Sequence, residues 1–135
     1  MHPGTATAPV SKRRHRAGEI LSGMAVLFLL FDSVIKVMVI APVVESFSQL
    51  GYPVSVARGI GLVELICLAV YVVPRTSIIG AILLTGYLGG AVATHVRVGS
   101  PLLTHVLFPI YIAVLLWGGL YLRDDRVRGL IAPRN

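Results

Sequence analysis

The chain has 135 residues and a net charge of +6, with 56% hydrophobic and only 13% charged residues. Soluble domains contain about 25% charged residues, so this composition excludes an ordinary water-soluble domain and indicates a protein of the lipid bilayer. Eight of the twelve basic residues lie in two flanks, without aromatic side chains interleaved among them to stack on bases. We therefore expect contact with lipid headgroups and not with nucleic acid. The basic flanking residues are Lys12, Arg13, Arg14, Arg16, Arg123, Arg126, Arg128 and Arg134.

Residues 1–16 have no hydrophobic periodicity and end in a basic run, which predicts a disordered basic tail. Four apolar segments follow, and each is close to the ~20 residues that cross the hydrocarbon as a helix. These segments are 17–40, 56–73, 77–96 and 104–122. Residues 123–135 are again basic and predict a second tail. The expected fold is therefore an all-α transmembrane four-helix bundle over 17–122.

The connections between the apolar segments differ in length. Residues 74–76 predict a tight hairpin, and Gly99 with Pro101 interrupts the helical pattern between the third and fourth segments. The longest connection, 41–55, contains helix breakers together with apolar residues. It either lies partly on the membrane or caps the bundle.

The distribution of Lys and Arg predicts the orientation of the spans. With both termini in the cytoplasm, nine basic residues lie on the cytoplasmic side and three on the other. Cytoplasmic flanks carry an excess of Lys and Arg, so we expect a multi-pass protein with both termini cytoplasmic. Several ionisable residues then fall toward the outer side of the bilayer. They are Asp32, Lys36, Glu64, His95 and His105.

A charge in hydrocarbon costs roughly 3 kcal/mol or more, so these residues should face a protein interior. Asp32 and Lys36 are spaced i, i+4, within ion-pair reach. They form either an internal salt bridge or a pocket cation with its orienting carboxylate. Glu64 has no partner in its own helix and must pair with another helix, with water, or take up a proton. Gly61 and Ala57 on the same stripe allow another helix to approach closely.

We expect Lys36, Glu64 and His95 to converge on one partly hydrated pocket in the outer half of the bundle. Mutual pairing would lower the cost of placing each group in the membrane. The residues expected around this pocket are Asp32 and Arg97, with His105 at its mouth.

The two histidines bracket a short loop and should lie at similar depth on adjacent helices. His95 and His105 are either a haem-ligating pair, part of a metal site with Asp32 and Glu64, or simply hydrogen-bonded interfacial side chains. Neighbouring hairpin ends rarely hold two rings across a flat macrocycle. We therefore expect no resident haem and no metal.

Gly86, Gly90 and Thr94 are spaced by four residues, which places small side chains along one face of the third span. Such a stripe permits close backbone contact between helices. We expect packing within the bundle, with contact between two protomers in a homo-oligomer as the alternative.

The chain contains no nucleophile elbow, phosphate-binding glycine loop, HExxH motif or evident nucleophile–base pair. The sequence therefore identifies no catalytic residue, and the case for an autonomous enzyme is thin.

Several short stretches in a fixed order resemble the DoxX-like family over roughly 18–122. They are LGYP at 50–53, GLVEL at 61–65, VPR at 73–75 and LTGYLGGAVATHVR at 84–97, together with Lys36 in the first span. The resemblance implies a small four-helix protein of the bacterial inner membrane. The family takes its name from a small subunit of an archaeal thiosulfate:quinone or terminal quinol oxidoreductase, and other relatives are linked to oxidative-stress complexes or to receptor assembly. The resemblance implies that the recurrent polar positions are Lys36, Glu64 and His95.

Three functional hypotheses follow. The chain is an accessory subunit that binds a small molecule or quinone and docks a membrane oxidoreductase. Alternatively, it is a small membrane enzyme using Lys36, Glu64 and His95, or an assembly factor without a ligand.

Overall fold

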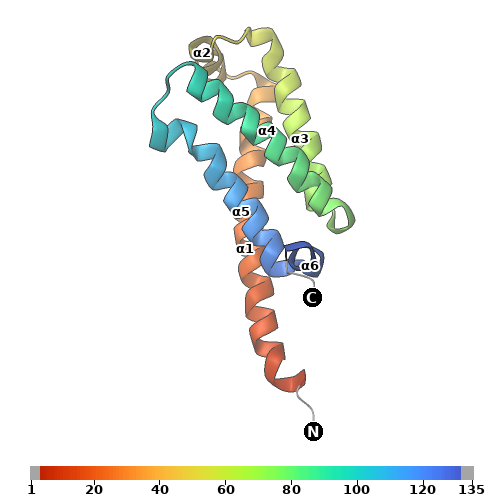
Figure 1. Ribbon diagram of the computed structural model, residues 1–135. Coiled ribbons are helices and arrows are strands. Elements are labelled where there is room, and N and C mark those ends of the chain that lie inside the picture. Colours follow the sequence, from red (N-terminus) through yellow and green to blue (C-terminus); the bar gives the residue numbers. More distant parts are fainter. Residues whose placement is uncertain (1–3, 132–135) are drawn as a thin grey trace.

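The structure is a computed structural model that describes residues 4–131, and these residues form helices without any strand (Figure 1). The α-helices are α1 (Gly4–Met38), α2 (Ala41–Leu50), α3 (Ala57–Val72), α4 (Ser77–Arg97), α5 (Phe108–Arg123) and α6 (Asp125–Ile131). Three short helices of other types connect them: η1 (Val54–Val56), η2 (Pro74–Thr76) and η3 (Leu102–Val106).

Within the described residues, four helical stretches are long and apolar enough to cross a membrane. They are Lys12–Met38, Val54–Val72, Pro74–Arg97 and Leu102–Arg123. Helix α1 packs against α3 and α5, and α4 packs against the same two helices, so the four form a closed ring. Leu84, Leu116 and Leu120 are fully buried at its centre. The prediction of an all-α transmembrane four-helix bundle is confirmed.

The structure differs from the predicted disordered tail at residues 1–16, because α1 already begins at Gly4. Once a span is helical, each further residue adds a hydrogen bond without a new nucleus, and Lys and Arg are good helix formers. An i, i+4 pair between His15 and Glu19, 2.9 Å apart, lies in this extension. Residues 1–3 lie outside the described part of the chain.

The predicted C-terminal tail at 123–135 also contains regular structure. Helix α5 continues through Arg123, and α6 follows after one residue. Val127 of α6 is buried in the core, and the Arg126 guanidinium donates to the carbonyl oxygens of Pro74 (2.6 Å) and Arg75 (3.3 Å). Helix α6 therefore joins the end of α5 to the α3–α4 hairpin. Residues 132–135 lie outside the described part.

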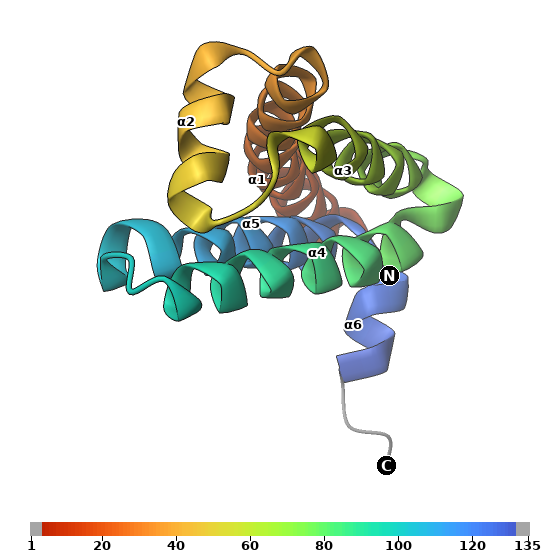
Figure 2. The same cartoon turned by 90° about the horizontal axis from the view of Figure 1, so that it is seen from above.

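The long connection 41–55 forms α2, which caps the end of the bundle opposite the termini (Figures 1 and 2). Val43 and Phe47 are buried against Ala57 and the end of α1. The helix ends at Gly51, whose φ of +76° is left-handed and whose neighbour Tyr52 donates its N–H to the Phe47 carbonyl. The capping alternative is therefore observed, and contact of this segment with the membrane stays a prediction.

The fourth span begins in a different way from the prediction. Its first turn, η3, is a π-helix, and the α-helix proper starts at Phe108 instead of near residue 104. Pro109 occupies the first turn of α5, where its missing N–H costs no hydrogen bond. The hairpin at 74–76 is confirmed as η2.

Candidate functional site

Lys36 is the centre of a polar cluster at the end of the bundle capped by α2. Its ammonium donates hydrogen bonds to Asp32 Oδ2 at 2.5 Å, to the Tyr87 hydroxyl at 2.6 Å and to Glu64 Oε2 at 3.2 Å. An ammonium has three protons, so these three partners use its whole donor capacity. Helices α1, α3 and α4 are joined through a single side chain.

Glu64 lies deepest in this cluster, with 0% of its side chain exposed. Its Oε2 accepts a second hydrogen bond, from the Tyr87 hydroxyl at 2.9 Å. Its Oε1 is also buried and has no hydrogen-bond partner among the described residues. Because Lys36 pairs with both Asp32 and Glu64, three ionised groups would leave one negative charge uncompensated.

Gly61 allows these charged groups to meet. A Cβ at Gly61 would lie 2.8 Å from the Lys36 Cβ and 2.8 Å from the Ser33 carbonyl oxygen, so only glycine fits between α1 and α3. Ala57, one turn earlier on the same face, is fully buried. The prediction that this stripe admits a neighbouring helix is confirmed. The close approach places Glu64, one turn further along, within reach of Lys36.

A cavity of about 450 Å³ opens beside the cluster. It is bordered by α1, by α2, by the start of α3 and by the second half of α4. Asp32 and Lys36 lie at its polar end. The side chain of Asp32 is 27% exposed and that of Lys36 17% exposed, so both are accessible from the cavity. The other lining residues are Ser46, Phe47, Leu50, Tyr52, Ile60, Gly86, Tyr87, Gly90, Ala91, Thr94 and His95.

The small-residue stripe of α4 forms one wall of this cavity. A Cβ at Gly86 or Gly90 would meet nothing within 4 Å. The prediction that this stripe packs closely against another helix of the bundle is therefore wrong, because small side chains leave the same signature whether a helix or open space lies opposite. Contact between protomers through the stripe stays a prediction.

His95 lies on the cavity wall but is not part of the Lys36 cluster. Its Nδ1 is 3.0 Å from the Ser100 hydroxyl, and its ring packs edge-to-face on His105 with centroids 5.6 Å apart. The two histidines therefore lie together, as their places around the short loop predict. Among the described residues His95 makes no hydrogen bond to Lys36 or Glu64.

Of the residues expected around the pocket, Asp32 lines the cavity, whereas Arg97 and His105 do not. Asp32 is a direct partner of Lys36 and lies inside the cluster. Arg97 does not line the cavity, because its guanidinium donates to the Leu50 carbonyl at 2.9 Å and lies 5.8 Å from the Tyr52 ring. Arg97 instead ties the end of α4 to the end of α2.

Tyr87 is the cluster residue that the sequence interpretation missed. Tyrosine in a span usually marks the membrane interface, whereas Tyr87 lies near the middle of α4. A hydroxyl at that depth requires a hydrogen-bond partner, and this requirement was the available signal. The cavity mouth carries a second tyrosine, Tyr52, whose hydroxyl is 3.1 Å from the Thr94 hydroxyl.

The cluster and cavity together can hold a small ring with polar substituents. Asp32 offers an accessible acceptor, Lys36 an accessible cation, and the remaining wall is largely apolar. Among the side chains that the structure describes, at residues 12–131, no three His, Cys, Asp or Glu are grouped so that they could hold a metal ion.

Comparison with known proteins gave one match. The family model described as the DoxX-like family matches residues 20–119, a range that contains the whole Lys36 cluster and the cavity. No curated protein and no solved structure matches the chain.

Proposed function

The chain belongs to the DoxX-like family, and on that premise we propose that it is an integral membrane subunit that binds a quinone or quinol ring in the cavity beside Lys36. One observation carries the proposal: a charged, hydrogen-bonded cluster at membrane depth opens into a cavity with apolar walls. Ionisable residues within spans usually mark a functional site. The volume of about 450 Å³ falls in the range of small-molecule pockets.

The two redox forms of such a ring match the two accessible polar groups. A quinol hydroxyl would donate to the Asp32 carboxylate. A quinone carbonyl would replace the Tyr87 hydroxyl as an acceptor of the Lys36 ammonium, whose three protons are otherwise all in use. The apolar side of the ring would lie along the flat wall that Gly86 and Gly90 leave open. Oxidation of a quinol releases two protons and two electrons. The uncompensated carboxylate charge favours the uptake of one of these protons at this end. We propose that the other proton leaves through the open cavity and that both electrons pass to a redox-active partner subunit.

The orientation of the bundle is part of the proposal. The chain ends lie at the end of the bundle remote from α2, close to most of the basic flanking residues (Figure 1). Because positively charged flanks remain on the cytoplasmic side, we place both termini in the cytoplasm of a bacterial cell and the cavity toward the outer side of the inner membrane. Reporter fusions after residue 131 and within 98–101 should report opposite sides of the membrane. A C-terminal reporter active only outside the cytoplasm would overturn this placement.

A matched pair of glycine variants tests ligand binding. Gly90→Leu places a side chain in the cavity, whereas Gly89→Leu adds the same side chain on α4 outside it, and neither new Cβ would meet an atom within 4 Å. Both variants should therefore fold. We expect purified wild type and Gly89→Leu to bind a short-chain ubiquinone or menaquinone in a calorimetric titration, and Gly90→Leu to lose at least tenfold in affinity.

The contrary results are equally clear. Absence of quinone binding to the wild-type protein, with no quinone extractable from protein purified out of native membranes, would refute quinone as the ligand. Equal affinity of the Gly89→Leu and Gly90→Leu variants would place any binding outside this cavity.

A further inference from the structure

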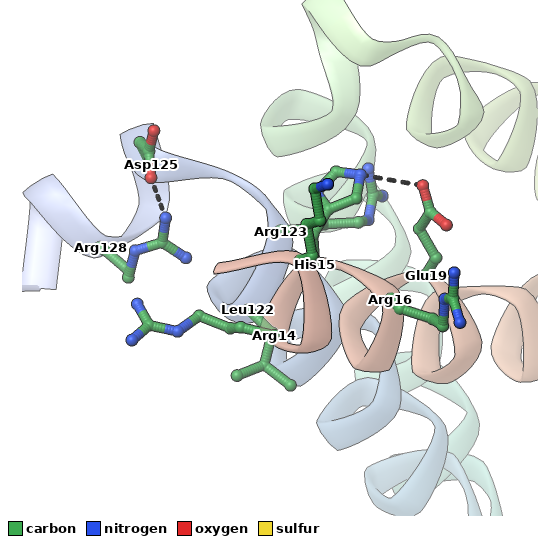
Figure 3. A pocket seen from close by; sticks show the side chains of 9 residues that line it. Arg14, His15, Arg16, Glu19, Leu122, Arg123, Asp125 and Arg128 are labelled. Atoms are coloured by element: carbon green, nitrogen blue, oxygen red, sulfur yellow. Dashed lines mark hydrogen bonds and ion pairs between the residues drawn. The ribbon is translucent and has the colours of Figure 1, made fainter. Parts of the chain in front are cut away.

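A second cavity, of about 500 Å³, lies at the opposite end of the bundle, where the two basic flanks meet (Figure 3). It is bordered by the N-terminal part of α1, the end of α5 and α6. Figure 3 shows Arg14 and Arg128 extending toward the same region from different helices. The lining residues are Lys12, Arg14, His15, Arg16, Glu19, Leu122, Arg123, Asp125 and Arg128.

The lining carries an excess of positive charge. Five of its residues are Lys or Arg, against two acidic residues, and both acids already have partners. Glu19 pairs with His15 at 2.9 Å, and Asp125 pairs with Arg128. Among the side chains described for residues 12–131, Arg14 and Arg16 have no ion-pair partner. Cations gathered around one hollow repel one another, and an anion bound in the hollow would relieve this repulsion.

Two of the arginines are held in place by hydrogen bonds to neutral groups of the protein, which for Arg128 act together with its ion pair to Asp125. Arg128 donates to the Tyr121 carbonyl at 2.5 Å, and Arg123 donates through Nε to the Ser22 hydroxyl at 3.1 Å while its guanidinium lies 5.6 Å from the Tyr71 ring. A guanidinium fork fixed in this way retains other N–H groups for a phosphate, which it binds in a planar, bidentate manner.

The depth of the cavity indicates where the anion comes from. The 22 residues from Ala17 to Met38 in α1 span about 33 Å at a rise of about 1.5 Å per residue, which matches the hydrocarbon thickness. Arg14 and Arg16 therefore lie within the first turn outside the hydrocarbon, at the level of the lipid headgroups. Leu122 adds an apolar surface on the same side. A ligand with both an anionic phosphate and an acyl chain fits this combination.

We propose that this cavity is a binding site for the phosphate of an anionic phospholipid, with Arg14 of α1 and Arg128 of α6 as its principal donors. A bound lipid would join the N-terminal part of α1 to α6, two elements that come from opposite ends of the chain. The proposal is independent of the quinone site, which lies at the other end of the bundle.

The experiment uses the full chain in mild detergent and follows added phosphatidylglycerol by native mass spectrometry. The variants are Arg14→Gln, Arg128→Gln and, as the matched control, Arg13→Gln. Arg13 is the exposed neighbour of Arg14 on the same helix but does not line the cavity. We expect Arg14→Gln and Arg128→Gln each to weaken lipid binding about tenfold, because each removes a charge-assisted hydrogen bond. Arg13→Gln should change it by less than about threefold, since it removes the same charge but no phosphate contact.

Two further titrations separate the sources of the anion. Phosphatidylcholine, which has a phosphate but no net charge, should bind more weakly than phosphatidylglycerol, and inorganic phosphate at equal ionic strength should compete poorly. Equal losses of lipid affinity in Arg13→Gln and Arg14→Gln would show that diffuse surface charge causes the binding, and would refute the proposed site. Saturation by inorganic phosphate together with no preference for phosphatidylglycerol would overturn the lipid as its ligand. Arg14→Gln provides the decisive comparison if the Arg128 variant detaches α6.

Discussion

Ionisable side chains cluster at both ends of the bundle, but the charges are paired within the protein at one end and are in positive excess at the other. At the end capped by α2, Lys36 is shared between two carboxylates and a tyrosine, and Glu64 is fully buried. At the end where the termini lie, arginines are largely exposed and outnumber the acids. Desolvated charges require partners within the protein, whereas charges at the headgroup level can leave their neutralisation to the surroundings. The charges at the first end therefore stabilise the bundle itself, whereas the positive charges at the second end are available to bind an anion.

The largest effect should follow from removing the cation of the buried cluster. Lys36→Met leaves the carboxylates of Asp32 and Glu64 without their shared partner, and breaking a buried ion pair from one side costs about 3–5 kcal/mol. The matched control is Lys12→Met at the basic end, which should change the free energy of unfolding by about 0.5 kcal/mol or less. Reversible unfolding in mixed detergent micelles measures both. Equal stabilities of the two variants would contradict the contrast between the ends.

A double substitution separates structure from function at the same cluster. Lys36→Met combined with Glu64→Leu removes both charges of the inner pair, so the double variant should recover about 1–3 kcal/mol relative to Lys36→Met alone. Its stability is read from the same unfolding transition. Recovered stability together with lost quinone binding would show that these charges serve ligand binding. Recovered stability with unchanged binding would make the pair purely structural.

The close contact between α1 and α3 should be the next most sensitive feature. Gly61→Ala adds a Cβ 2.8 Å from Lys36 Cβ and from a backbone oxygen of α1, so the two helices must separate. Overpacking of this kind typically costs about 1–3 kcal/mol. Gly59→Ala is the control on the same helix, because its Cβ would meet nothing within 4 Å and alanine favours helix by about 1 kcal/mol. Destabilisation by both variants to the same degree would refute the importance of the close approach.

Removal of one hydroxyl should have a smaller effect. Tyr87→Phe deletes the acceptor of a Lys36 hydrogen bond and the donor of a Glu64 hydrogen bond, and we expect a loss of about 1–2 kcal/mol. Tyr121→Phe is the control, since Tyr121 lies 44% exposed near the basic end. It should stay within about 0.5 kcal/mol of wild type in thermal unfolding. An unchanged free energy of unfolding in Tyr87→Phe would show that the two carboxylates alone satisfy the hydrogen bonding of Lys36.

Much of this arrangement is predictable from the sequence, because the bilayer restricts the choices. Apolar runs of sufficient length predict the spans, and the i, i+4 spacing of Asp32 and Lys36 predicts their ion pair. Glu64 has no partner within its own helix, and this predicts a bond to another helix. Gly61 then indicates which face of α3 meets α1.

The features that were missed depend on distances between helices, which a local pattern does not contain. Gly86 and Gly90 have the spacing of a helix-packing stripe but border a cavity. Tyr87 is a residue type that usually marks the membrane interface, but its hydroxyl accepts a hydrogen bond from Lys36 inside the bundle. Helix α6 lies in a basic stretch that has the sequence pattern of a tail. It was missed because its stability depends on hydrogen bonds from Arg126 to the α3–α4 hairpin, which no local pattern contains.

The smallest effect concerns the carboxylate that precedes α6. Hydrogen bonds from the Arg126 side chain, assisted by the Arg126 backbone N–H, hold the pKa of Asp124 below its ordinary value of about 3.9. A carboxyl whose pKa is lower in the folded state stabilises the fold above its unfolded pKa, and this contribution is lost as the pH falls through its folded pKa. The attachment of α6 should therefore be unaffected near neutral pH and weaken only in acid, below about pH 4.

Arg126→Gln should raise the pKa of Asp124 toward its ordinary value, as followed by a carboxyl-carbon NMR titration. Arg75→Gln is the control, because Arg75 contributes only its backbone carbonyl to Arg126. An Asp124 titration that does not move in Arg126→Gln, or moves equally in Arg75→Gln, would show that this ion pair is not what orders the basic end.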